Sequence, residues 1–305
     1  MTKARSPLIW FGGKSKYAEF IISRMPSHKK YIEPFGGAAH VIAQKGRIGH
    51  EVYNDIDGNV VNFLLVASSH PEKLRESCEA IPYSRQLYER WKKEPLPDDD
   101  FERAVRWFYM NRSGISKGNA KDVADTGWRH STKSNQNPAN GYISACRLIN
   151  DFAERMKGVM IEHDDFRNII TKYDDADALF YVDPPYIGRE QYYAGNFSEQ
   201  DHRDLAELLN SIKGKAIISY YDDPLLDELY PNWNREYFDA YKQVVGGHGE
   251  NCRAEELLLM NYDNGQLDLF SLSDYCGGGL KSLIWIRIKP YPRWAGEVSC
   301  CKPGM

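Results

Sequence analysis

The sequence predicts an α/β fold built on a mostly parallel sheet, because strand-like runs alternate with amphipathic helical patterns. Runs of β-branched and aromatic residues, each ending in a polar or glycine-rich turn, predict strands at residues 31–35, 51–55 and 178–182. Helical patterns follow at residues 38–44, 60–66 and 201–212. Further strands are predicted at residues 215–219 and 257–262. This alternation is typical of sheets covered by helices on both faces, whose ligands bind at the carboxyl ends of the strands.

The alternation stops between residues 68 and 158. Predicted helices at residues 87–91 and 101–110 are followed by a polar loop, residues 111–141, rich in Gly, Ser, Asn and Lys. A loop of that length inside a compact domain is usually functional. We therefore divide the chain into a core (residues 1–67 and 159–262), an insertion (residues 68–158) and a tail (residues 263–305).

The composition excludes several classes of protein. The 305 residues contain no run near the ~20 apolar residues that span a bilayer. The N-terminus has no apolar signal segment, so we expect a cytoplasmic protein without membrane contact. The six cysteines form no CxxC pair, which favours free thiols over zinc, and we expect no metal.

One segment of this acidic chain is basic. The net charge is −4, but residues 103–147 carry eight Lys or Arg against two acids, a local charge of +6. Local basic surfaces bind nucleic-acid phosphates, and a merely solvated face is the alternative. The eight residues are Arg103, Arg106, Arg112, Lys117, Lys121, Arg129, Lys133 and Arg147.

The turn Asp183-Pro184-Pro185-Tyr186 follows the predicted strand at residues 178–182. An exocyclic amino group of a nucleobase is a weak nucleophile, because its lone pair is delocalised into the ring. A carboxylate and a backbone carbonyl held at a fixed angle can accept its hydrogens, and successive prolines fix such an angle. A tyrosine just beyond can stack on a base drawn out of the duplex. A simple strand-ending turn is the alternative.

A second turn, Glu33-Pro34-Phe35-Gly36-Gly37-Ala38, ends the first predicted strand. Two glycines let the backbone approach a cofactor, and the following helix N-terminus favours a carboxylate. Asp55, at the end of the next strand, can accept hydrogen bonds from a ribose. Asn54 and Asp57 compete for this role, and capping of the next helix is the alternative for all three.

In their order along the chain, six features resemble the Dam-like D12 class of adenine-specific DNA methyltransferases over residues 6–262. They are Trp10-Phe11-Gly12-Gly13-Lys14, Glu33-Pro34-Phe35-Gly36-Gly37, Asp55, Asp165-Phe166, Asp183-Pro184-Pro185-Tyr186 and Ser219-Tyr220. The long insertion before the Asp-Pro-Pro-Tyr turn resembles the α group. The resemblance implies a Rossmann-like class I S-adenosylmethionine-dependent methyltransferase sheet with an inserted, largely helical target-recognition domain.

This resemblance also implies an activity: methyl transfer from S-adenosylmethionine to the N6 amino group of adenine in duplex DNA, by base flipping and direct in-line attack. Methylation of cytosine N4 or of RNA is the alternative chemistry, since similar turns serve it. A catalytically silent DNA-binding relative is the non-enzymatic alternative, and the intact Asp183 and Lys14 argue against it.

The resemblance assigns roles residue by residue. Lys14 would offer charge to the cofactor carboxylate, Asp55 would bind the ribose, and Asp165 would lie near the adenine amino group of the cofactor. Helix capping is the alternative for Asp165, and core packing for Trp10. The implied catalytic residues are Asp183, Pro184, Pro185 and Tyr186, and the implied cofactor-binding residues are Trp10, Lys14, Phe35, Gly36, Gly37, Asp55, Asp165 and Asp183.

In the insertion, residues 108–114 resemble a segment with which family members approach DNA. Phosphate or guanine contacts are expected from basic side chains there. Relatives that recognise GATC carry further elements that this chain lacks, so a GATC target is not expected. The predicted DNA-binding residues are Asn111, Arg112, Lys117, Lys121, Arg129 and Lys133.

The pentapeptide Gln266-Leu267-Asp268-Leu269-Phe270 lies beyond the predicted core. It resembles the peptide by which bacterial DNA-processing enzymes bind the sliding clamp. The glutamine can bond at a pocket edge while leucine and phenylalanine fill an apolar cleft. An amphipathic strand or linker end is the alternative. The resemblance implies clamp binding through Gln266, Leu267, Leu269 and Phe270.

Overall fold

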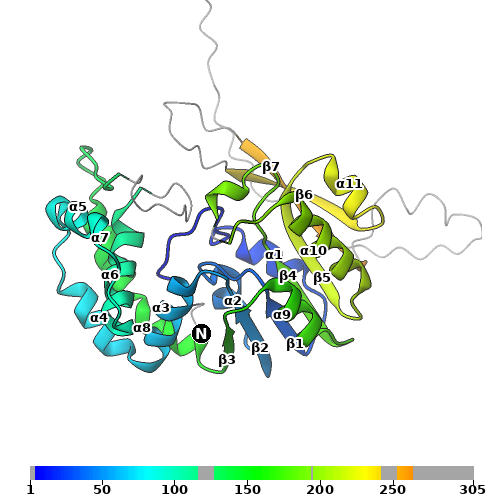
Figure 1. Ribbon diagram of the computed structural model, residues 1–305, viewed down its shortest axis with the longest axis horizontal. Helices are drawn as coiled ribbons and strands as arrows, with labels where there is room; N and C mark the ends of the chain where they lie inside the picture. Colours follow the sequence, from blue (N-terminus) through cyan, green and yellow to red (C-terminus); the bar gives the residue numbers. More distant parts are fainter. Residues whose placement is uncertain (1–3, 116–126, 194, 242–252, 264–305) are drawn as a thin grey trace, which may run out of the picture. The chain divides into compact units, whose positions relative to one another are not determined.

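The computed structural model describes residues 4–115, 127–193, 195–241 and 253–263. These belong to a compact unit spanning residues 1–264. Within the described residues, seven strands form one sheet in the order β3-β2-β1-β4-β5-β7-β6 (Figure 1). The strands are β1 (Lys30–Glu33), β2 (His50–Asn54), β3 (Val159–Glu162), β4 (Ala178–Val182), β5 (Lys215–Tyr221), β6 (Asn234–Tyr241) and β7 (Arg253–Met260).

The sheet is mostly parallel, as the sequence predicts. Strands β3, β2, β1, β4 and β5 run parallel, whereas β7 pairs antiparallel with both β5 and β6. The chain order runs outward from β1 through β2 to β3, and in the other direction from β4 to β5. A crevice opens at the carboxyl ends of the strands where such an order reverses, between β1 and β4.

Helices cover both faces of the sheet, because successive strand residues point to opposite faces. Tyr31, Tyr53 and Tyr181 belong to the core on one face, and the residues one position away belong to the core on the other. The helices on the first face are α1 (Ala18–Arg24), α2 (His40–Gln44) and α3 (Gly58–Ser69), and those on the second are α9 (Phe166–Tyr173), α10 (Glu199–Ser211) and α11 (Leu225–Leu229).

In the described part of the predicted insertion, which leaves out residues 116–126, five helices lie between α3 and β3 (Figure 1). They share a core with the first face of the sheet: the Phe108 ring stacks on Phe63 of α3, with the ring centroids 5.3 Å apart. The insertion therefore packs against α3, one of the helices on this face of the sheet. The helices are α4 (Pro71–Glu79), α5 (Arg85–Lys93), α6 (Asp100–Ser113), α7 (Pro138–Arg147) and α8 (Ile149–Met156).

The predicted loop at residues 111–141 is wrong at both ends. Helix α6 continues to Ser113, and α7 begins at Pro138. Asn137 caps α7 by accepting a hydrogen bond from the backbone N–H of Ala139, and proline is favoured at the first helical position. Asn137-Pro138 is therefore a helix start within a segment whose composition suggests a loop.

Candidate active site

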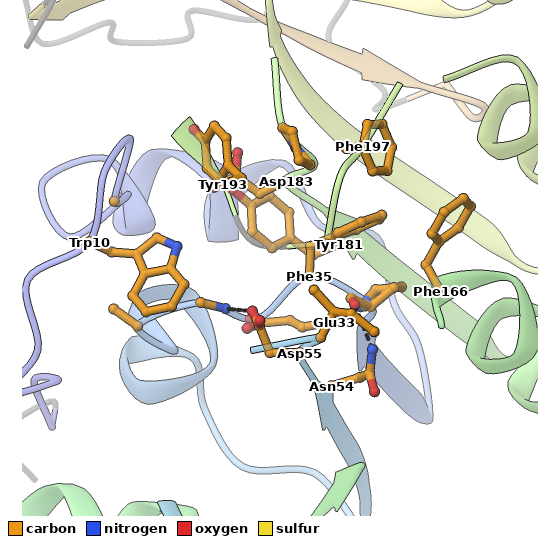
Figure 2. A pocket seen from close by; sticks show the side chains of 18 of the residues that line it. Trp10, Glu33, Phe35, Asn54, Asp55, Phe166, Tyr181, Asp183, Tyr193 and Phe197 are labelled. Atoms are coloured by element: carbon orange, nitrogen blue, oxygen red, sulfur yellow. Dashed lines mark hydrogen bonds between the residues drawn. The ribbon is translucent and has the colours of Figure 1, made fainter. Parts of the chain in front are cut away.

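A pocket lies at the carboxyl ends of β1, β2 and β4, next to the reversal in strand order. Figure 2 shows Phe35, Phe166 and Phe197 gathered on one side of it and Trp10 on the other. The three phenylalanine rings contact one another, with centroids 5.2 to 5.8 Å apart. All eight predicted cofactor-binding residues line this pocket: Trp10, Lys14, Phe35, Gly36, Gly37, Asp55, Asp165 and Asp183.

The glycine pair is required by two aromatic rings. A Cβ on Gly36 would collide with the ring of Tyr53, and a Cβ on Gly37 would collide with the indole of Trp10. Gly37 also has a φ of +48°, in the region that favours glycine. Trp10 thus contacts both the core and the pocket, and the two glycines let Tyr53 and Trp10 pack closely against the turn after β1.

Asp55 links the turn after β1 to the turn after β2. Its Oδ2 accepts a hydrogen bond from the Gly37 N–H (2.7 Å, Figure 2), and its Oδ1 accepts one from the Asp57 N–H (2.8 Å). The side chain is buried, and burial raises its pKa to about 7. This carboxyl group therefore changes charge near neutral pH.

The two competitors of Asp55 hold the backbone instead. Asn54 donates to the carbonyls of Pro34 (2.8 Å) and Asp164 (2.9 Å), and so ties the ends of β1, β2 and β3 together. Asp57 caps α3 by accepting a hydrogen bond from the Asn59 N–H (2.9 Å). Asp57 therefore fills the helix-capping role that was the alternative for all three residues, and Asp55 and Asn54 do not cap α3.

Asp165 has a structural contact as well as a place in the pocket. It caps α9 by accepting a hydrogen bond from the Arg167 N–H (2.8 Å), as the alternative interpretation proposes. It also forms an ion pair with the Arg167 guanidinium (3.1 Å), and this guanidinium contacts Asp201 and Asp204 of α10. Capping and pocket lining are compatible, since the carboxylate is half-exposed.

Asp183 is held by two residues that are distant in the sequence. Its Oδ1 accepts hydrogen bonds from the Lys14 ammonium (2.9 Å) and from the Ser219 hydroxyl (2.9 Å). In the part of the chain that the structure describes, these are the side-chain hydrogen bonds that Asp183 accepts, and both are made to Oδ1. The carboxylate is therefore fixed in orientation, while Oδ2 remains available to a substrate.

Lys14 is a buried cation with only 2% of its surface exposed. Besides Asp183, it bonds the carbonyl of Gly12 (2.8 Å) and lies 4.9 Å from the centre of the Tyr186 ring. Burial by itself lowers the pKa of Lys14, but the attraction of Asp183 and Glu256 outweighs it and raises the pKa overall. Lys14 therefore stays charged beside Asp183, and the expected contact with a cofactor carboxylate stays a prediction.

The rest of the Asp-Pro-Pro-Tyr turn is packed into the protein. Pro184, Pro185 and Tyr186 are buried, and Pro185 lines the pocket with Asp183. The Tyr186 ring lies edge-on to Tyr221, with centroids 4.7 Å apart, and is 3% exposed. Stacking of Tyr186 on a base therefore requires a movement that exposes more of its ring, and this stacking stays a prediction.

The predicted DNA-binding residues differ in their surroundings. Asn111 forms two hydrogen bonds with the backbone of Ile9 (2.7 and 2.9 Å), and Arg112 donates to the carbonyl of Gly141 (3.2 Å). Burial lowers the pKa of Arg112 to about 10. Arg129 donates to the carbonyl of Gly114 (3.3 Å), whereas Lys133 is exposed. Lys117, Lys121 and the clamp-motif residues Gln266, Leu267, Leu269 and Phe270 lie outside the described residues.

Within the described ranges, every helix is too short or too polar to cross a lipid bilayer. The same ranges bring together no cluster of His, Cys, Asp and Glu of the size that binds a metal ion. Cys78 and Cys146 are free thiols.

Two residues near Asp183 were not predicted from the sequence. The hydrogen bond of Ser219 to Asp183 was missed, and Glu256 was given no role. The sequence signal for Glu256 is a carboxylate directly before an apolar strand segment.

Three features meet at one pocket of this mostly parallel sheet: a glycine turn after β1, an acid after β2 and an acidic proline turn after β4. Together they define a methyltransferase of the class I fold. Residues 10–243 match the D12 class N6 adenine-specific DNA methyltransferase family, and the chain belongs to this family. The enzyme methylates the N6 amino group of adenine in DNA.

Several curated relatives support this assignment. The chain is similar to the DNA adenine methylase of Haemophilus influenzae, with 25% identity covering 85% of this chain and 94% of the relative. It is 26% identical to the Retron Ec67 DNA adenine methylase of Escherichia coli, covering 83% and 90%. It is 23% identical to the Type II methyltransferase M.MjaIII of Methanocaldococcus jannaschii, covering 84% and 98%.

Proposed function

We propose that the enzyme takes its methyl group from S-adenosylmethionine bound in the pocket and transfers it by direct in-line attack of an adenine amino group flipped out of duplex DNA. The observation that carries this proposal is the one-sided bonding of Asp183. Lys14 and Ser219 hold Oδ1, so Oδ2 is presented to the amino group of the base. A backbone carbonyl of the proline-fixed turn accepts the second amino hydrogen.

The pocket residues fit this cofactor. S-adenosylmethionine supplies a methyl group on a positively charged sulfur. Gly36 and Gly37 line the pocket, where their backbone can lie close to a bound ligand. Asp55 would accept hydrogen bonds from the ribose, Asp165 would lie near the cofactor's adenine, and the phenylalanine cluster offers apolar faces to that ring.

The chain's own residues then perform three tasks. Asp183 draws the amino nitrogen towards tetrahedral geometry by accepting one of its hydrogens. Lys14 and Ser219 prevent rotation of that carboxylate, so the geometry is prepared before the base enters. Tyr186 stacks on the flipped base. No covalent bond between protein and base is needed, because the amino group is itself the nucleophile.

We assign the insertion, residues 68–158, to target recognition in duplex DNA, with residues 1–67 and 159–262 as the catalytic domain. Helices α4 to α8 provide the scaffold, and the exposed Lys133 provides phosphate-binding charge. Arg129, Lys117 and Lys121 follow the same assignment from the sequence. A cytoplasmic location agrees with the free thiols of Cys78 and Cys146.

Clamp binding by residues 266–270 is supported by the sequence motif. Alanine at both Leu269 and Phe270 should abolish co-purification with the sliding clamp and leave methylation of short oligonucleotides unchanged. A loss of about 3–5 kcal/mol in the free energy of unfolding would instead assign these side chains to the protein's own core.

A pair of aspartates at opposite ends of β4 tests the catalytic assignment. Asp183 follows the strand and faces the pocket, whereas Asp177 precedes it and forms an exposed ion pair with Lys29. Asp183→Ala should lower single-turnover methyl transfer by about a hundredfold or more, because nothing then orients the amino group. Asp177→Ala should transfer methyl groups at the wild-type rate. If Asp183→Ala keeps more than about a tenth of that rate, an effect below ~1.4 kcal/mol, the assignment is wrong.

A further inference from the structure

Glu256 is a buried acid near the catalytic carboxylate. It lies in β7, next to the apolar run Leu257–Met260, and its side chain is 4% exposed. In the sheet it stands opposite Tyr221 of β5 and Phe238 of β6. A carboxylate at such a position is costly unless it is paired, so its partner identifies its role.

That partner is Lys14. The Glu256 Oε2 lies 3.8 Å from the Lys14 ammonium nitrogen, and the same nitrogen bonds Asp183 Oδ1 at 2.9 Å. The three side chains form a charge row, Asp183–Lys14–Glu256, in which Lys14 and Glu256 are buried and Asp183 is partly exposed. The row joins the turn after β4, the N-terminal loop and β7.

The row fixes where the ammonium can lie. An ammonium has three N–H groups, and in this enzyme the carbonyl of Gly12 and Oδ1 of Asp183 take two of them. Glu256 attracts the same ammonium from β7, at 3.8 Å. Without that attraction, Lys14 could move towards both oxygens of Asp183 and occupy the oxygen that the base needs.

We propose that Glu256 is a positioning residue, which acts through Lys14 to keep Asp183 Oδ2 free for the adenine amino group. This inference rests on the proposed role of Asp183. Glu256 touches neither base nor cofactor in this account. Its influence should therefore show in the methyl-transfer step and should disappear when Lys14 is removed.

The test is a double-mutant cycle in the full-length enzyme. Glu256→Gln keeps the shape and removes the charge, and it should lower the single-turnover rate roughly tenfold. The affinity for S-adenosylhomocysteine and the melting temperature should stay near wild-type values. In a Lys14→Met background, adding Glu256→Gln should lower the single-turnover rate by less than about a further twofold, because the effects of residues that act through one another are not additive.

Glu51 provides the matched control. It is also a buried acid in the sheet, on β2, and it bonds Arg155 (2.8 Å) away from the pocket lining. Glu51→Gln should lower the melting temperature and leave the methyl-transfer rate of the folded enzyme unchanged. If Glu256→Gln behaves like Glu51→Gln, or if its effect persists without Lys14, the inference is overturned. The proposed function fails separately, through an inactive wild-type enzyme or an active Asp183→Ala variant.

Discussion

Lys14 at the carboxyl edge of the sheet and Arg106 in the helical insertion are both buried cations, but they bind different partners. Lys14 bonds the carboxylate of Asp183 at the pocket, whereas Arg106 donates to the backbone carbonyls of Trp91 and Glu94 (2.6 and 2.7 Å) and pairs with the half-exposed Glu94 carboxylate (3.5 Å). Carbonyls at the end of a helix need donors, and an arginine that supplies them is structural. The place of the partners, at the pocket or at the end of a helix, therefore separates chemistry from scaffolding.

The same distinction explains the basic insertion. The local charge of +6 in residues 103–147 suggests a phosphate-binding face. Yet Arg103, Arg112 and Arg129 donate to backbone carbonyls as Arg106 does, while Lys133 is exposed. These backbone bonds therefore fix the positions of the arginines without removing their charge.

The largest expected effect in this comparison is on stability. Arg106→Met should lower the free energy of unfolding by about 2–4 kcal/mol, since two carbonyls at the end of α5 lose a charged donor. Denaturant melts give this value. Arg106→Met should leave the salt dependence of DNA binding unchanged, and a shallower salt slope would show that Arg106 contacts phosphate.

The next effect concerns the pocket. Because burial raises the pKa of Asp55 to about 7, its ionised form dominates above that pH and its neutral form below it. An ionised carboxylate accepts ribose hydroxyls better, so S-adenosylmethionine affinity should fall about tenfold between pH 8 and pH 6. Calorimetry on wild type and Asp55→Asn measures this. Equal pH dependence in both proteins would assign the titration to another group.

The smallest effect is on DNA affinity. Lys133→Ala should reduce the slope of log affinity against log salt concentration by about 0.9, the contribution of one phosphate contact. Its free energy of unfolding should change by less than about 0.5 kcal/mol. An unchanged salt slope would mean that Lys133 is only a solvated surface residue.

The sequence predicts the central strands well, because buried strands are continuous apolar runs. The predicted strand at residues 178–182 coincides with β4. The short β3 is missed because four residues carry too little pattern, and β6 is missed because polar residues interrupt its aromatic ones. The strand predicted at residues 257–262 lies at Arg253–Met260, shifted towards polar residues that pair with β6.

The pocket lining follows from motif order, but the bonds within it do not. Lys14 and Asp183 are 169 residues apart, and Ser219 and Asp183 are 36 apart. Their meeting depends on β4 lying beside β5 and on the path of the N-terminal loop. No local pattern encodes these distances, so the orientation of Asp183 required a structure.

The central claim is that Asp183, held on one side, presents Oδ2 to an adenine amino group. The most direct measurement uses S-adenosylmethionine with a deuterated methyl group, duplex oligonucleotides, and mass spectrometry of the digested nucleosides. We expect deuterated N6-methyldeoxyadenosine with the wild-type enzyme and essentially none with Asp183→Asn. Label on deoxycytidine, or equal labelling of deoxyadenosine by both proteins, would contradict it.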